Sequence, residues 1–159
     1  MNFRIGFGYD VHQLKEGLDF FLGGIKIPHH KGCIAHSDGD VLIHAICDAI
    51  LGAANLGDIG YHFPDNNKEF KSIDSKILLK RTIDLLTDNG FGLGNIDCTV
   101  CLQTPKIGGY IPQMKEALAE VTGLSVKDIS IKATTTEKLG FQGREEGISS
   151  YAVVLINKV

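Results

Sequence analysis

The stretch Asp40-Val-Leu-Ile-His-Ala-Ile-Cys-Asp-Ala-Ile-Leu51 decides the fold of this chain. It predicts a helix that opens at His36-Ser-Asp-Gly39, where Ser37 or Asp38 is the expected cap, and that ends at about Asn55. The helix is apolar nearly all round, so we expect it to be buried.

Three ionisable residues of this helix, Asp40, His44 and Asp48, fall on one stripe at positions i, i+4 and i+8. Buried ionisable groups are unfavourable unless they are paired or bind a metal. The stripe therefore indicates either an internal Asp–His hydrogen bond or a metal site, and the helix alone does not decide between them.

Asp10-Val-His12, at the end of a predicted opening strand, offers partners for a metal site. Residues i and i+2 share a strand face, so this carboxylate and imidazole converge, although an isolated motif of this kind is more often a surface pair. With His44 they supply one oxygen and two nitrogens, the ligand set of a catalytic zinc site with an open fourth position. Asp40 or Asp48 would then orient the ligating imidazole.

The other predicted elements are strands and helices in a mixed order. The order β-β-α-α-β-α-β-β predicts an α+β fold, a single mixed β-sheet with helices packed on one face in two layers. The open face needs a cover, and a partner subunit is one way to provide it. Strands are predicted at 4–9, 20–27, 95–103, 129–135 and 150–157, further helices at 72–88 and 111–121, a loop at 57–67, and a loop or short helix at 139–147.

Composition limits the classes of partner. The 159 residues fit one domain, 1–159, with 43% hydrophobic and 22% charged residues. The net charge of −3 and the lack of a Lys/Arg run argue against nucleic acid and anionic membranes. No signal peptide or apolar run of ~20 residues is seen. We expect a cytoplasmic protein, or one of a plastid-type organelle if an upstream transit peptide was removed.

Cys98 and Cys101 form a C-x-x-C motif that is typical of zinc or redox sites. They lie in a predicted strand, however, where positions three apart point to opposite faces. No second C-x-x-C exists, so we expect inert core cysteines.

Three segments could bind a phosphorylated ligand. His36-Ser-Asp-Gly39 would offer free N–H groups at a helix N-terminus, with plain capping as the alternative. Lys132-Ala-Thr-Thr-Thr-Glu137 combines hydroxyl donors with an oxygen ligand suited to Mg²⁺, with a strand end and polar loop as the alternative. Gly57-Asp-Ile-Gly-Tyr-His-Phe-Pro-Asp65 is a loop of a type that often holds ligands.

These motifs closely resemble the 2-C-methyl-D-erythritol 2,4-cyclodiphosphate synthase family of the non-mevalonate isoprenoid pathway. The resemblance covers nearly the whole chain in the family's order. The matching segments are Gly8–His12, Ala35–Ala45, Leu51–Ala53, Gly57–Asp65, Gln103–Lys106 and Lys132–Ile148.

The resemblance implies a homotrimer with active sites between subunits, zinc on Asp10, His12 and His44, and Mg²⁺ or Mn²⁺ on Glu137. It implies that His36 and Thr135 stabilise the transition state. The substrate-binding residues that it implies are Asp10, His12, His36, Ser37, Asp58, Ile59, Gly60, Phe63, Asp65, Pro105, Lys106, Thr134, Thr135, Thr136, Glu137, Phe141 and Arg144, the last near the trimer axis.

The implied reaction is a cyclisation. In 4-diphosphocytidyl-2-C-methyl-D-erythritol 2-phosphate, a nucleotide diphosphate, the 2-phosphate attacks the β-phosphorus and expels CMP. A zinc phosphohydrolase and a non-catalytic isoprenoid-phosphate-binding module are the alternatives. The chain departs from the family at Asn67, where a carboxylate is lost, and at Ile107-Gly-Gly-Tyr110, which is more flexible than the usual run.

Overall fold

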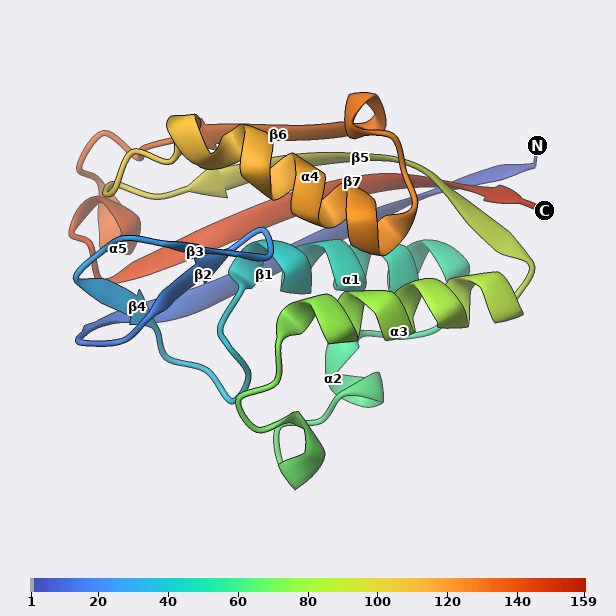
Figure 1. Ribbon diagram of the computed structural model, residues 1–159, viewed down its shortest axis with the longest axis horizontal. Helices are drawn as coiled ribbons and strands as arrows, with labels where there is room; N and C mark the ends of the chain where they lie inside the picture. Colours follow the sequence, from blue (N-terminus) through green and yellow to red (C-terminus); the bar gives the residue numbers. More distant parts are fainter. Residues whose placement is uncertain (1) are drawn as a thin grey trace.

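A computed structural model describes residues 2–159 of the chain, and its main feature is a mixed five-stranded sheet (Figure 1). The strand order is β4-β1-β7-β5-β6, with β5 and β6 parallel and the other pairs antiparallel. The mixed α+β prediction is confirmed. The strands are β1 (Phe3–Glu16), β4 (Lys31–Cys33), β5 (Phe91–Cys101), β6 (Ile129–Thr134) and β7 (Gly147–Lys158).

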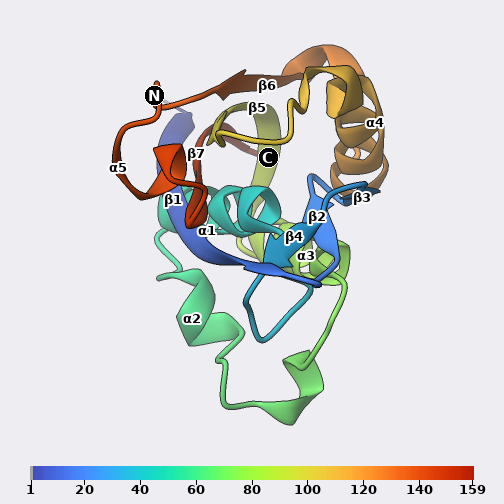
Figure 2. The ribbon, with the colours of Figure 1, turned by 90° about the vertical axis from the view of Figure 1, so that its left-hand side faces the viewer.

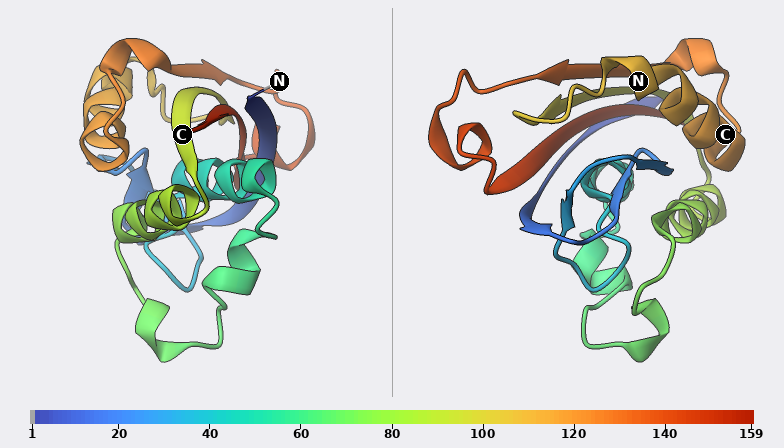
Figure 3. Two further views of the ribbon diagram at one scale, coloured as in Figure 1. Left: turned by 90° about the vertical axis from the view of Figure 1, so that its right-hand side faces the viewer. Right: turned by 60° about the vertical axis from the view of Figure 1, so that its left-hand side comes forward.

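The long helices form a second layer on one face of this sheet. Seen end-on, β1 lies to one side of the molecule and α3 and α4 lie to the other, with α1 between them (Figures 2 and 3). α1 packs against β1 and β7, α3 against α1 and β5, and α4 against β6 and α3. The short elements α2 and η1 lie below this layer in Figure 1, away from the sheet. The helices are α1 (Val41–Ala54), α2 (Ile59–His62), α3 (Ser75–Asp88), α4 (Ile111–Thr122) and α5 (Gly140–Gly143), with 3₁₀ turns η1 (Lys68–Phe70), η2 (Gly108–Tyr110) and η3 (Val126–Asp128).

Several predicted boundaries differ from the observed ones. The opening strand does not end near Tyr9 but continues to Glu16, so Asp10 and His12 lie within it. The predicted strand at 20–27 is a separate hairpin of β2 (Phe20–Leu22) and β3 (Ile25–Ile27). The predicted ends of α3 at Asn89-Gly90 and of α4 at Gly123 are confirmed.

The cap of α1 is Asp40, so the predicted caps Ser37 and Asp38 are wrong. Asp40 is wholly buried and accepts hydrogen bonds from the backbone N–H groups of Ile43, Gly23 and Gly24. Burial raises the pKa of Asp40 despite these donors. One carboxylate therefore starts the helix and fixes the β2–β3 turn against it.

Strand β1 approaches α1 unusually closely, because glycine faces the helix at Gly6 and Gly8. A Cβ atom at Gly6 would lie 1.8 Å from the carbonyl oxygen of Ala49, and one at Gly8 would lie 2.0 Å from that of Ala45. Such distances are impossible, so only glycine allows this contact. Asp10 and His12 continue the same strand face and are therefore carried to the start of α1.

The opposite face of β1 is apolar and exposed. Phe3, Ile5, Phe7, Tyr9 and Val11 alternate with the residues that face the helix, and each is at least 42% exposed. Among the described residues, none of the long helices covers this face. An exposed apolar patch of this kind is typical of an interface.

We expect Gly8→Ala to destabilise the protein by roughly 1–3 kcal/mol or more, because the new methyl group must push α1 away from β1. Urea unfolding measures this. Gly108→Ala is the matched control, since a Cβ there meets nothing within 4 Å. Equal unfolding midpoints for the two variants would contradict the close contact.

Candidate metal centre and active site

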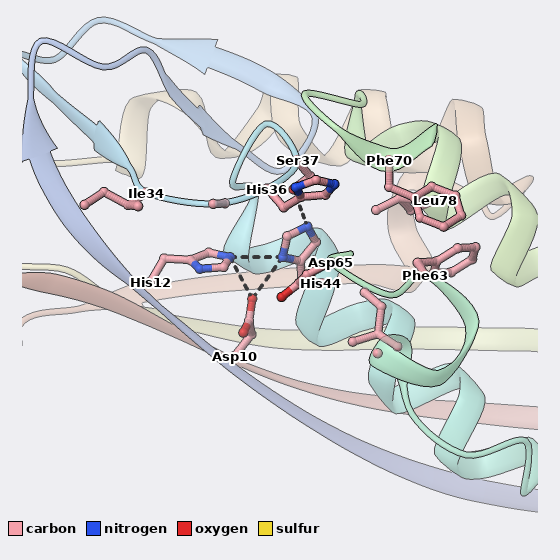
Figure 4. A pocket seen from close by; sticks show the side chains of 13 residues that line it. Asp10, His12, Ile34, His36, Ser37, His44, Phe63, Asp65, Phe70 and Leu78 are labelled. Atoms are coloured by element: carbon pink, nitrogen blue, oxygen red, sulfur yellow. Dashed lines mark hydrogen bonds and ion pairs between the residues drawn. The ribbon is translucent and has the colours of Figure 1, made fainter. Parts of the chain in front are cut away.

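Asp10, His12 and His44 meet at one point (Figure 4). Asp10 and His12 project from β1, and His44 from the first turn of α1. Nε2 of His12 lies 3.0 Å from Nδ1 of His44, and each nitrogen lies 3.1 Å from Oδ2 of Asp10. The predicted convergence of these three side chains is confirmed.

This triangle fits a metal ion better than a set of hydrogen bonds. A carboxylate has no hydrogen to give, so the imidazole nitrogens of His12 and His44 must serve all three contacts. If both nitrogens carry hydrogen, two donors face each other; if only one does, an imidazole lone pair faces the carboxylate of Asp10. Around a tetrahedral zinc, ligand atoms are about 3.3 Å apart, close to the observed 3.0–3.1 Å.

The electrostatics of the triad favour an ionised carboxylate. Burial raises the pKa of Asp10, but contacts with His12 and His44 outweigh it and hold that pKa below its usual range. Burial lowers the pKa of His44, but the contact with Asp10 outweighs it and the net shift is upward. A metal ion would compete with protons for His44, so its binding would be linked to pH.

The groups that contact the far side of the His44 ring are hydroxyls. Nε2 of His44 lies 3.1 Å from Oγ of Ser37 and 3.0 Å from Oγ of Ser75. Sequence reasoning missed Ser75, because it lies 31 residues further along the chain in no recognisable motif.

The two carboxylates predicted to orient His44, those of Asp40 and Asp48, accept hydrogen bonds from backbone N–H groups instead. Asp40 caps α1, and Asp48 accepts a hydrogen bond from the N–H of Ile59 at 3.1 Å. The prediction that one of them orients the imidazole is therefore wrong. At the start of α1 the carboxylate of Asp40 accepts a hydrogen bond from the N–H of Ile43, so capping is present there, and the anion site at His36-Ser-Asp-Gly39 stays a prediction.

A cavity of about 350 Å³ opens beside the triad. Its walls include most of the site residues predicted from the first half of the chain. Ile34, Ala35, Phe70 and Leu78 complete the walls and were not predicted. The predicted residues that line it are Asp10, His12, His36, Ser37, His44, Ile59, Gly60, Phe63 and Asp65.

The other residue predicted in this half, Asp58, is not on that wall. It caps α2 by accepting a hydrogen bond from the N–H of Tyr61 at 2.8 Å. In the same region His36 contacts the backbone oxygen of Asn67 through Nε2 at 3.0 Å. The residue that departs from the family pattern, Asn67, also caps η1.

The predicted site residues from the second half of the chain do not line this cavity. Pro105 and Lys106 follow β5. Thr134 ends β6, and Thr135, Thr136 and Glu137 follow it. α5 lies where β6 ends and β7 begins (Figure 1). Within one chain the predicted site is thus divided. This second group is Pro105, Lys106, Thr134, Thr135, Thr136, Glu137, Phe141 and Arg144.

The turn after β6 has a strained backbone. Glu137 and Lys138 both have positive φ, at 53° and 64°. The turn is held by local bonds: Thr135 Oγ1 donates to the Glu137 carboxylate at 3.1 Å, and Thr136 Oγ1 donates to the Leu139 carbonyl. Strain of this kind is concentrated at functional sites.

The four cysteines are free. Cys98 is buried and Cys101 is half-buried, as alternation along β5 predicts. Burial raises the pKa of Cys98 to about 12, so little thiolate forms at neutral pH. The prediction of inert thiols agrees with this environment.

The chain matches a known family over almost all its length: a model of the YgbB family fits residues 3–157. The chain belongs to this family. Among curated relatives in the YgbB family, the 2-C-methyl-D-erythritol 2,4-cyclodiphosphate synthase of Bacteroides fragilis is 64% identical over 159 residues, which is all of both chains. That of Bacteroides thetaiotaomicron is 61% identical over 99% of each chain. The resemblance seen in the sequence is confirmed.

Solved structures of the same family share the fold. IspF of Plasmodium falciparum in a CDP complex is 36% identical, with a TM-score of 0.86, over 99% of this chain and 97% of that one. A CDP-bound 2C-methyl-D-erythritol-2,4-cyclodiphosphate synthase is 34% identical, with a TM-score of 0.90, over 97% and 100%. In the bifunctional IspDF of Campylobacter jejuni, at 44% identity and a TM-score of 0.95, this chain covers 42% of the longer chain.

In residues 2–159, no helix is both long and apolar enough to span a membrane. The curated relatives described above are bacterial, so they lend no support to the organelle alternative. The cytoplasmic location stays a prediction.

We expect His44→Ala to lower bound metal well below that of the parent protein, because it removes one of three converging ligands. The protein should stay folded, since the side chain lies at the cavity wall. Elemental analysis of dialysed protein measures the metal, and circular dichroism the fold. His30→Ala, an exposed histidine paired with Glu16, is the control and should keep the metal. Unchanged metal content in His44→Ala would refute the triad as the site.

Proposed function

We propose that this chain converts 4-diphosphocytidyl-2-C-methyl-D-erythritol 2-phosphate to 2-C-methyl-D-erythritol 2,4-cyclodiphosphate and CMP, within the non-mevalonate isoprenoid pathway. The observation that carries the proposal is the Asp10–His12–His44 triangle at the wall of a cavity large enough for a small phosphorylated ligand. Relatives at 61–64% identity carry this enzyme's name. Residues 1–159 would form one catalytic domain.

The reaction needs positioning more than proton transfer. An oxygen of the 2-phosphate forms a bond to the β-phosphorus, the bond from that phosphorus to the bridging oxygen breaks, and CMP leaves with the electron pair. Both reacting groups belong to one molecule, so folding it into the reacting geometry can lower the barrier by about 7–11 kcal/mol. The phosphate nucleophile is already ionised and needs no strong base.

The second requirement is positive charge, since two anionic phosphates approach each other in a protein of net charge −3. We assign His36 and Thr135 to stabilising the transition state, and Ser37 and Lys106 to holding phosphate oxygens. Zinc on the triad, and Mg²⁺ or Mn²⁺ on Glu137, would supply Lewis-acid stabilisation of charge on those oxygens.

The donor set suits these assignments. Two imidazoles and a carboxylate are ligands that zinc accepts, whereas the lone carboxylate of Glu137 suits a harder ion that keeps phosphate oxygens and water as its other ligands. Glu137 is exposed, and among the described residues its carboxylate accepts a hydrogen bond from Thr135.

The complete site would form between subunits of a homotrimer. Support comes from the division of the predicted residues: the triad and its cavity belong to one group, and Lys106, Thr135 and Glu137 to another that does not reach that cavity. A neighbouring copy could bring the second group to the first. The exposed apolar face of β1 is a surface suited to such assembly. Arg144 would then lie near the trimer axis.

We expect Phe7→Asp to abolish assembly, because it places a charge on the exposed apolar face of β1. The variant should elute at the mass of a monomer, keep its metal and lose CMP release. Light scattering after size-exclusion chromatography measures the mass. Ile77→Asp on α3, also an exposed apolar position, is the control and should remain trimeric. A monomeric parent protein, or a trimeric Phe7→Asp variant, would contradict the assembly.

The reaction itself is tested with purified substrate in ¹⁸O-labelled water. Cyclisation should release one CMP per cyclic product, with no label in either. Label in a product would instead identify a phosphohydrolase. Binding of the substrate without CMP release, with metal present, would identify a binding module.

A further inference from the structure

Two hydroxyl groups lie beside Nε2 of His44, and a single hydrogen on that nitrogen can be donated well to only one of them. With Nδ1 directed into the triad, the neutral ring carries one hydrogen, on Nε2. Oγ of Ser37 and Oγ of Ser75 lie 3.1 and 3.0 Å from that nitrogen. One of the two hydroxyls accepts the hydrogen, and the other is left for a different task.

Of the two hydroxyls, that of Ser75 is the one arranged to accept the Nε2 hydrogen of His44. Its own hydrogen is committed, since Ser75 Oγ donates to Oδ1 of Asp38. Its backbone N–H donates to the other oxygen of the same carboxylate, at 2.9 Å. Ser75 is wholly buried, so water does not compete for its remaining lone pairs, and its Oγ lies 3.0 Å from Nε2 of His44. Asp38 thus fixes the orientation of the Ser75 hydroxyl.

The position of Ser75 is itself tightly set. Ser75 is the first residue of α3, and the segment before it is bonded to the loop before α1. The N–H of Ser72 donates to the His36 carbonyl at 2.7 Å, and the N–H of Asp38 donates to the Ile73 carbonyl at 3.0 Å. These two bonds therefore fix the position of the start of α3 relative to the loop that forms the cavity wall.

Ser37 is left with a free donor. Its Oγ accepts a hydrogen bond from the N–H of Gly39 at 3.2 Å, and it lines the cavity. When Ser75 accepts the hydrogen of His44, the hydroxyl hydrogen of Ser37 is available to an anion in that cavity.

We propose that Ser75 and Asp38 are positioning residues of the metal centre. Asp38 orients the Ser75 hydroxyl, and Ser75 holds the Nε2–H of His44, which keeps Nδ1 in the triad and leaves the Ser37 hydroxyl for a phosphate oxygen. A hydrogen-bond partner behind a ligating histidine is a general means of fixing its tautomer and direction. This inference rests on the proposed use of the triad as a metal site.

The test compares Ser75→Ala with Thr82→Val. Thr82 lies on the same helix and is also wholly buried, but its hydroxyl donates to the Leu78 carbonyl and does not contact the site. Zinc affinity is measured by competition with a chromophoric chelator. We expect Ser75→Ala to weaken zinc binding by about 10–100-fold, the usual effect of removing such a partner, and Thr82→Val to change it less than about twofold. Asp38→Asn should weaken zinc binding in the same direction.

A second readout follows the ligand geometry directly. The visible absorption of the Co²⁺-loaded protein should change in Ser75→Ala and stay unchanged in Thr82→Val. With substrate, Ser75→Ala should raise KM, because His44 then takes the hydroxyl of Ser37 as its acceptor. Should Ser75→Ala fail to fold, Asp38→Asn carries the same comparison.

The failures can be told apart. Parent-like zinc affinity and Co²⁺ absorption in Ser75→Ala, or an equal loss in Thr82→Val, would overturn the positioning role. A parent protein that binds no zinc would instead overturn the proposed metal site.

Discussion

The close contact of β1 with α1 is the constraint on which the site depends. Gly6 and Gly8 have no side chains, so the helix backbone at Ala45 and Ala49 rests directly on the strand. With a larger residue at either glycine, the separation of strand and helix would be set by side chains. His44 follows the helix, and its Nδ1 must lie within about 3 Å of two atoms on the strand. The metal triad is in this sense a product of backbone packing.

The chain divides its polar groups between two places. The partly buried triad gathers cation ligands around one carboxylate, Asp10, with Ser37 beside it, while Lys106 and Glu137 lie on the turns after β5 and β6. A protein of net charge −3 has little general attraction for a diphosphate, so local donors and bound cations must provide it. The strained turn at Glu137 and Lys138 belongs to the second group, where geometry outweighs local stability.

Much of this could be predicted from local patterns, and the remainder depended on distant partners. The buried helix, its end near Asn55 and the convergence of Asp10, His12 and His44 followed from periodicity and residue chemistry. The role of Asp40 did not, because two of its three donors, Gly23 and Gly24, lie 17 and 16 residues away. Ser75 has no local signature either: a buried serine at a helix start is ordinary until the fold sets it behind a histidine.

The alternation along β1 also restricts how this chain can vary. Glycines and ligands occupy one side of the strand and large apolar residues the other, over eight consecutive positions from Ile5 to His12. Inserting or deleting a single residue there would exchange the two sides, pressing phenylalanine into the helix and turning the ligands outward. A point substitution changes one side chain. A change of length in this segment instead disrupts the contact with α1, the Asp10–His12–His44 triad and the exposed apolar face together. We therefore expect insertions and deletions among homologous chains to be rarer in this segment than in the rest of the chain.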